Sequence, residues 1–106
     1  MQYCFTNIQR HGTCCFEFQR GAFCGTYWQD TSIYLYDDDF DQLCLYKIFT
    51  PEFQYYGETV MTAEQWHQIY LSAQKVGGEV KKVIDEIDSW AQECFKVETV
   101  FTILGL

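Results

Sequence analysis

The chain has few basic side chains and no long apolar segment. Seven Lys and Arg residues stand against 15 Asp and Glu, so the formal net charge is −8. This balance disfavours direct binding of nucleic acid, because phosphate recognition needs a basic surface. No stretch approaches the roughly 20 apolar residues of a membrane span, and the first ten residues form neither a charged leader nor an apolar run. We therefore expect a cytoplasmic protein that binds neither nucleic acid nor membrane directly.

Signatures of catalysis and of metal binding are also missing. The sequence has no GxSxG, no HExxH and no glycine-rich phosphate loop, and its six cysteines form no CxxC pair. Residues 11–15 hold one histidine and two cysteines but lack the second ligand pair of a structural zinc site. Residues 37–41 have the spacing that opens a calcium-binding loop, but Gln42 and Ile48 occupy the positions of its glycine and its bidentate glutamate. We predict no enzyme activity, no cofactor and no metal, with reduced cysteines that mostly fill the core.

Aromatic and apolar side chains are abundant, and they predict one folded domain over residues 1–106. The hydrophobic share is 48% and the aromatic share 19%, far from the composition of a disordered chain. Short runs rich in aromatic and β-branched residues predict four strands in a meander, at 3–8, 13–19, 22–28 and 32–36. The first half is therefore expected to form an antiparallel sheet.

Residues 13–19 alternate between two kinds of side chain. Phe16 and Phe18 share one face of the predicted strand, whereas Glu17 and Gln19 share the other. Such alternation is typical of a strand with one buried and one solvated face. We therefore expect helices on one face of the sheet and water on the other.

Two helices or helical segments are predicted after the aspartates. Apolar residues spaced i, i+3 and i+4 favour a short helix over 40–49, which the preceding aspartates can cap. The helix is expected to end at residue 49 because Thr50 precedes Pro51. A strand fits the same residues. Thr62–Gln65 fits a capping box. Apolar residues then recur in steps of three and four from 66 to 94 without a break at the two glycines.

The unbroken phase favours one long helix bent at Gly77 and Gly78, with two separate helices as the alternative. Residues 97–104 are β-branched and aromatic and predict a last strand that returns to the sheet. The expected fold class is therefore α+β. It combines an antiparallel sheet of about five strands, one face of which the long, bent or split helix covers, with one short helix.

The middle third of the chain concentrates both acids and aromatic side chains. Residues 30–64 contain eight acids and one lysine, and residues 34–42 read YLYDDDFDQ. Such a segment is either a solvated acidic loop or an interaction surface in which aromatic anchors are ringed by charge. A basic protein partner is favoured, because such a field accelerates its approach. Strand alternation places Tyr34 and Tyr36 opposite Ile33 and Leu35, facing outward. The candidate binding residues are Asp37, Asp38, Asp39, Asp41, Tyr34, Tyr36 and Trp28, with Glu52 and Glu58 as outer candidates.

The second half has a recognisable order of segments. MTAEQWHQIY, then GGEVKKVIDEIDSWAQECF, then the closing TVFTILGL resemble the small cytosolic immunity proteins encoded beside bacterial polymorphic toxins, in particular those of contact-dependent growth inhibition systems. The resemblance covers about 45 residues, concerns scaffold features and transfers no functional residue. It implies a protein that binds and neutralises a cognate toxin domain. Many such toxins are nucleases with basic substrate clefts, and a ribonuclease is favoured here.

Two other functions fit the same sequence. One is a phage-encoded acidic mimic of nucleic acid that blocks a host defence nuclease, for which the surface chemistry would be nearly the same. The other is a small enzyme that depends on a thiol or a metal, because a cysteine and a histidine distant in sequence can meet in the fold. The oligomeric state is not predicted.

Overall fold

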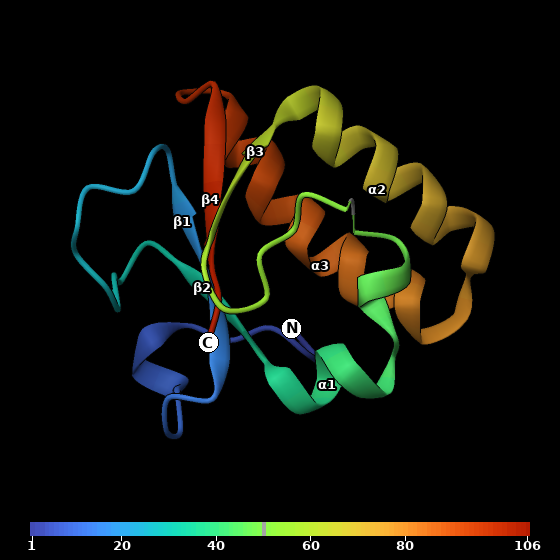
Figure 1. Cartoon of the computed structure of the whole chain (residues 1–106), viewed down its shortest axis with the longest axis horizontal. Helices are drawn as coiled ribbons and strands as arrows, with labels where there is room; N and C mark the ends of the chain where they lie inside the picture. Colours follow the sequence, from blue (N-terminus) through green and yellow to red (C-terminus); the bar gives the residue numbers. More distant parts are fainter. Residues whose placement is uncertain (50) are drawn as a thin grey trace.

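A computed structural model of the chain describes residues 1–49 and 51–106 and has the predicted α+β architecture. Four antiparallel strands form one sheet in the order β2-β1-β4-β3. Two helices pack on one face of this sheet, and a third, short helix lies at one end (Figure 1). The strands are β1 (Cys15–Arg20), β2 (Ile33–Tyr36), β3 (Glu58–Thr62) and β4 (Val100–Leu104).

The helical face of the sheet is apolar because the strand register aligns its apolar side chains. Phe18 of β1 pairs with Ile33 of β2 on one side and with Ile103 of β4 on the other. All three belong to one buried cluster with Trp66 and Ile87 of the two long helices. The prediction that Phe16 and Phe18 share the buried face of β1 is therefore confirmed.

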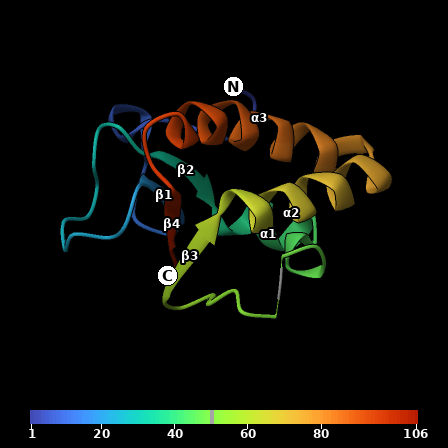
Figure 2. The same cartoon turned by 90° about the horizontal axis from the view of Figure 1, so that it is seen from above.

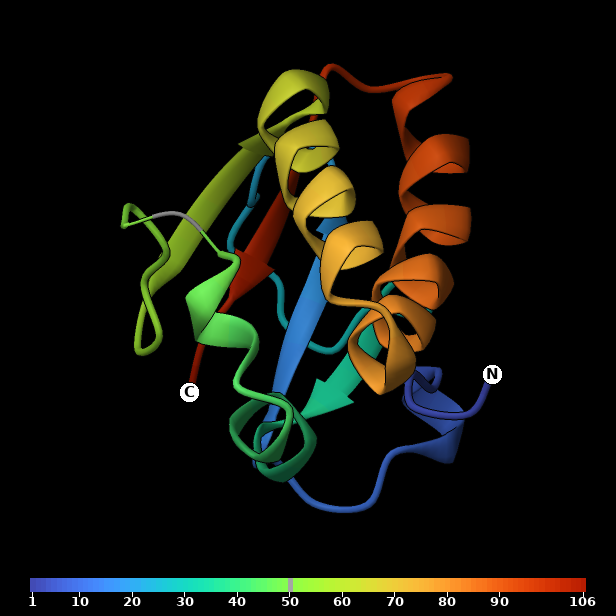
Figure 3. The same cartoon turned by 90° about the vertical axis from the view of Figure 1, so that its right-hand side faces the viewer.

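The two long helices are α2 (Ala63–Val76) and α3 (Gly78–Phe95), and they lie side by side over the strands (Figure 3). The expected single bent helix is wrong, and the alternative of two helices is correct. Gly77 has φ 71° and ψ −160°, a backbone conformation that is essentially restricted to glycine, so the chain reverses there. The predicted capping box at the start of α2 is confirmed: Thr62 Oγ1 accepts from Gln65 N at 3.2 Å, and Gln65 Oε1 accepts from Thr62 N at 3.0 Å. None of the described helices is long and apolar enough to cross a membrane.

Several predicted elements of the first half are corrected. Residues 3–8 contribute only a single bridge between Phe5 and Tyr34, and residues 22–28 form a loop. Gly25 and Trp28 within this loop and Gly21 just before it have positive φ angles, which a strand does not accommodate. Conversely, β3 was not predicted, and the sheet has four strands rather than about five. The last strand is confirmed but begins at Val100.

The short helix begins earlier than predicted. It is α1 (Asp37–Gln42), so the aspartates form its first turn instead of preceding it. Cys44 then adopts a left-handed conformation with φ 53°, which ends the helix, and Leu45–Lys47 form a separate 3₁₀ turn. Thr50, which entered the prediction of the helix end, lies outside the described residues.

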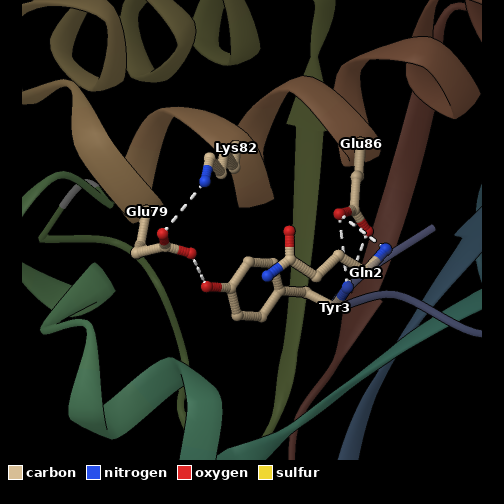
Figure 4. A network of polar contacts seen from close by, with 5 residues as sticks. All are labelled: Gln2, Tyr3, Glu79, Lys82 and Glu86. Carbon is tan, nitrogen blue, oxygen red and sulfur yellow. Dashed lines mark hydrogen bonds and ion pairs between the residues drawn. The ribbon is translucent and has the colours of Figure 1, made fainter.

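The N-terminal segment is fastened to α3 and covers the outer edge of β2. The Glu86 carboxylate accepts hydrogen bonds from the backbone N–H groups of Gln2 at 2.9 Å and Tyr3 at 3.0 Å, and the Tyr3 hydroxyl donates to Glu79 (Figure 4). The backbone N–H of Cys4 donates to the same Glu86 carboxylate at 2.9 Å. Further along, Phe5 and Tyr34 exchange two backbone hydrogen bonds, at 2.9 and 3.1 Å. The edge of β2 is therefore occupied by the protein itself.

Candidate protein-binding surface

Helix α1 holds the four aspartates of residues 37–41 together on about one turn and a half of backbone. Phe40 is 1% exposed and fixes the helix to the core, where its ring packs at 4.7 Å from that of Phe16. Asp38 and Asp41 are exposed, and Asp37 and Asp39 are half-buried. Three of these carboxylates lie in the first turn, where the helix dipole favours negative charge. We call this element, residues 37–42, the acidic helix.

The environment of Asp39 disfavours the ionised form of its side chain. Partial desolvation, followed by the neighbouring charge of Asp38, raises the pKa of the Asp39 carboxyl above its ordinary value. A carboxyl whose pKa is raised in the folded state destabilises that state once it ionises. The acidic helix therefore carries a charge that the free protein accommodates at some cost.

The substitution Asp39→Asn is expected to raise the melting temperature at pH 7 by at most about 3 °C. Because the pKa is raised, the folded state holds this proton to higher pH than the unfolded state does, so wild-type stability declines as pH rises through the titration of Asp39. The advantage of the variant should consequently vanish at acid pH, where Asp39 is protonated in both states. Thermal melts of both proteins from pH 3 to 7 check this, with Glu52→Gln as the control for removal of an exposed charge. A lower melting temperature for Asp39→Asn at pH 7 would contradict it.

Tyr55 and Tyr56 connect the acidic helix to the face of the sheet that lies opposite α2 and α3. The Tyr55 hydroxyl lies 3.0 Å from both carboxylate oxygens of Asp41. Burial, followed by this hydrogen bond, raises the pKa of Tyr55 to about 12, so the hydroxyl remains a donor near neutral pH. The ring of Tyr55 contacts that of Tyr56 edge-on, with centroids 4.8 Å apart, and Tyr56 is 80% exposed.

A hollow of about 440 Å³ lies on the sheet face opposite the helices. The loop 21–32 forms one wall, on the side of the sheet away from α2 and α3 (Figures 1 and 2). The C-terminal end of β4 forms another wall and lies at the same end of the sheet as α1 (Figures 1 and 3). The hollow is lined by Thr13, Cys15, Glu17, Phe23, Tyr27, Trp28, Tyr56, Gly57, Glu58, Leu104, Gly105 and Leu106.

A buried carboxylate positions the loop wall of the hollow. Glu17 is 2% exposed, and its side chain accepts hydrogen bonds from the backbone N–H groups of Trp28 at 2.8 Å and Gln29 at 2.9 Å. The Ser32 hydroxyl donates to the same carboxylate at 2.7 Å. These bonds hold Trp28 at φ 60°, a conformation that is unusual for a bulky residue. The expected solvated face of β1 is therefore wrong: Glu17 and Gln19 are buried beneath the loop.

Trp28 belongs to a stack of aromatic and cationic groups. Its ring lies 6.0 Å from that of Tyr34, and the Arg10 guanidinium lies 4.0 Å from its centroid. Tyr34 is completely buried, and its hydroxyl donates to the Gln29 carbonyl at 2.8 Å. Burial, followed by the charge of Glu17, raises the pKa of Tyr34. The stack makes this wall rigid.

The candidate binding residues separate into four groups in the structure: the aspartates, the pair that lines the hollow, Glu52, and the two strand tyrosines. The aspartates share the acidic helix, and Trp28 and Glu58, which are 30 positions apart in sequence, meet in the hollow. Glu52 is exposed but does not line the hollow.

Tyr34 and Tyr36 do lie on the face opposite Ile33 and Leu35, but the expectation that both are outward is wrong. Tyr34 is buried beneath Phe5 and Trp28, and Tyr36 is half-buried, with its hydroxyl accepting from the His11 N–H at 3.0 Å.

The candidate residues omitted Glu17, Tyr27 and Tyr56. Tyr27 is 56% exposed and, like Tyr56, lines the hollow. Nothing in the sequence indicated Glu17, because a carboxylate between two phenylalanines in a strand is the ordinary pattern of a solvated face. No local pattern distinguishes Tyr27 and Tyr56 from the other tyrosines, because their role depends on how distant segments meet.

The cysteines and the remaining acids show no arrangement for metal chemistry. Cys4, Cys15 and Cys94 are buried, and all six thiols are free. Among the residues that the structure describes, no three side chains of His, Cys, Asp or Glu are grouped so as to hold an ion. The acidic helix and the hollow therefore remain the candidate surface. No protein-family model, curated protein or solved structure matches this chain.

Proposed function

We propose that this protein is an immunity protein that binds and neutralises a basic toxin domain, a nuclease and preferably a ribonuclease, through the acidic helix and the adjoining hollow. The observation that carries the proposal is the acidic helix: four carboxylates lie within five residues of one helix that the buried Phe40 anchors, and Asp37 and Asp41 share one face of it. Nuclease clefts are basic because they bind phosphate, and a concentration of carboxylates on one short helix is complementary to them in charge. The segment resemblance to immunity proteins agrees with this chemistry.

The raised pKa of Asp39 supports a binding role for the acidic helix. Partial desolvation and, second, the neighbouring charge of Asp38 disfavour ionised Asp39 in the free protein, and a cationic partner would offset both. Charges that lower the stability of the free protein are common at functional surfaces. A solvated acidic helix with no partner would gain nothing from this arrangement beyond the favourable first-turn charges.

The first experiment is capture from the lysate of the native organism, with the protein as bait, at low and at high salt. The proposal requires one basic protein whose capture weakens as salt rises, whose nuclease activity is inhibited by the bait, and whose gene is adjacent to that of the bait. A captured host nuclease and a gene in a phage operon would instead establish the nucleic-acid mimic. A captured protein without nuclease activity would reject both.

The quadruple variant Asp37→Asn, Asp38→Asn, Asp39→Asn and Asp41→Asn is expected to associate with the captured nuclease about 10- to 100-fold more slowly at low salt. The reason is loss of the local attractive field, so the dissociation rate should change less than the association rate. Surface plasmon resonance at several salt concentrations measures both rates.

A matched variant separates local from overall charge. Asp30→Asn, Glu64→Gln, Glu93→Gln and Glu98→Gln change the net charge by the same amount at four exposed positions outside the acidic helix. This control should slow association much less. Equal slowing by both variants, or unchanged binding and protection with the aspartate variant, would show that the acidic helix is not the docking element.

A further inference from the structure

We propose that the hollow receives an arginine side chain of the basic partner, with its guanidinium against Glu58 and the rings of Tyr27 and Tyr56. This inference rests on the proposed function for the partner being a basic protein and specifies how that partner is recognised. It concerns a surface separate from the acidic helix, because none of the four aspartates lines the hollow.

The lining of the hollow is negatively charged. It contains two carboxylates, Glu17 and Glu58, and no lysine or arginine. Glu17 already accepts three hydrogen bonds from the loop at 2.7 to 2.9 Å, and its role is therefore to position the wall. Within residues 1–49 and 51–106, the exposed Glu58 carboxylate has neither an ion pair nor a hydrogen-bond donor. Glu58 is thus the group that is available to a cation.

Aromatic rings flank the same opening. Tyr27 packs edge-on against Phe23 with centroids 5.0 Å apart, and Tyr56 packs against Tyr55. Each of the two tyrosines is nevertheless more than half exposed, at 56% and 80%. An aromatic face attracts a cation, and it does so more strongly once water is excluded. Rings beside an unpaired carboxylate are therefore complementary to a positive side chain.

Arginine suits this arrangement better than lysine or an apolar side chain. Its planar guanidinium stacks on aromatic rings and pairs with a carboxylate through two parallel hydrogen bonds, whereas an ammonium is a compact, strongly hydrated charge. Leu104 and Leu106 in the lining of the hollow offer apolar contact to the methylene groups of the side chain. A volume of about 440 Å³ also lies within the range of about 300 to 1,000 Å³ that holds small ligands.

The hollow is preformed in the free protein. Trp28 is held at φ 60° by hydrogen bonds to Glu17, and its ring is fixed against Tyr34. A wall fixed in this way loses little conformational entropy on binding, which favours affinity for a small group. Backbone conformations of this kind persist only where surrounding contacts impose them, and they cluster at functional sites.

The test uses the full chain and a small probe, so it does not depend on the identity of the partner. Protein labelled with ¹⁵N is titrated with N-acetyl-arginine N-methylamide and, separately, with the norleucine analogue. We expect saturable amide shifts for the arginine probe at Trp28, Glu58 and Leu106, and none at the acidic helix beyond a non-saturating effect of added charge. Equal shifts with the norleucine probe would overturn the inference in favour of an apolar occupant, and no saturable shift would overturn it outright.

Matched variants assign the affinity to the proposed groups. Glu58→Gln should weaken binding of the arginine probe about two- to fivefold, whereas Glu52→Gln, an equal change of charge outside the hollow, should not. Tyr56→Leu should also weaken binding, whereas Tyr46→Leu, which removes an exposed tyrosine elsewhere, should leave it unchanged. If the variant and the control of each pair bind the arginine probe with the same affinity, the hollow is not the binding site of the probe. Binding by the probe together with failure to capture a nuclease would retain the cation site and reject the proposed function.

Discussion

Replacing Glu17 by alanine is expected to lower the free energy of unfolding by about 3–5 kcal/mol. The carboxylate is 2% exposed, and its loss would leave the partly buried N–H groups of Trp28 and Gln29 and the buried hydroxyl of Ser32 without their acceptor. Each donor left without an acceptor lowers the free energy of unfolding by about 1–3 kcal/mol. Since small domains are stable by only about 5–15 kcal/mol, the loop 21–32 should lose its fixed position well below the temperature of global unfolding.

The variant Glu17→Gln separates acceptor chemistry from side-chain volume. Whichever way the amide is turned, its NH₂ group faces a backbone N–H, because Trp28 N donates to one oxygen and Gln29 N to the other. We therefore expect a loss of about 2–3 kcal/mol in urea denaturation, although the shape is conserved. Gln19→Ala is the control, because Gln19 is buried on the same strand and donates one neutral hydrogen bond, to the Thr26 carbonyl at 2.8 Å. It should cost less than Glu17→Gln, and the reverse order would show that the carboxylate does not organise the loop.

Glu17 also illustrates what the sequence could predict about the fold. Period-two alternation placed Phe16 and Phe18 on the core face of β1 correctly, because that periodicity is a property of the strand itself. Glu17 and Gln19 were expected in water because they are polar. Their burial depends on donors and carbonyls of the loop 21–32, whose path is set by positive φ angles and tertiary contacts. No local pattern contains that information.

The prediction of one bent helix in the second half of the chain was wrong for a different reason. Apolar residues keep the same phase from Trp66 to Cys94, and this continuity favoured one bent helix. In the structure α2 and α3 reverse direction at Gly77, yet each turns its apolar stripe toward the same sheet. A helical hairpin with this spacing satisfies the pattern as well as a single helix does, so phase alone cannot distinguish the two. The glycine pair was the better indicator.

The candidate surface was predictable only where it is local in sequence. The four aspartates were expected together because they lie within five consecutive positions. The hollow was not expected, because Trp28 and Glu58 approach each other only through the strand order β2-β1-β4-β3, in which β4 inserts between β1 and β3. Such a long-range pairing is not encoded in any short window. Tyr34 was placed on the correct face by alternation, but the segment that covers it comes from the chain around Phe5.

Gly105→Ala is expected to lower the free energy of unfolding by about 2–4 kcal/mol. A methyl group at this position would overlap the Tyr55 carbonyl oxygen and lie 2.9 Å from the Gln54 carbonyl oxygen. The backbone of residues 54–57 would have to move away, which breaks the hydrogen bonds from Gly105 N to Gly57 O at 2.7 Å and from Leu106 N to Tyr55 O at 3.0 Å. The melting temperature should fall by several degrees for each kcal/mol lost.

The same substitution should uncouple the acidic helix from the hollow, because residues 54–57 carry both Tyr55, which bonds to Asp41, and Tyr56, which lines the hollow. Faster hydrogen exchange at the amides of Gly105 and Leu106, together with loss of arginine-probe shifts at Glu58, would report this directly. Gly57→Ala is the matched control for stability, since a methyl group there meets only the Gln54 side chain, with Cβ at 3.3 Å. Because Gly57 lines the hollow, the arginine-probe shifts of Gly105→Ala are compared with those of the wild type. If Gly105→Ala has the melting temperature of the wild type and Gly57→Ala has a lower one, the close approach at Gly105 does not hold residues 54–57 in place. The two parts of the surface would then have to be treated as mechanically independent.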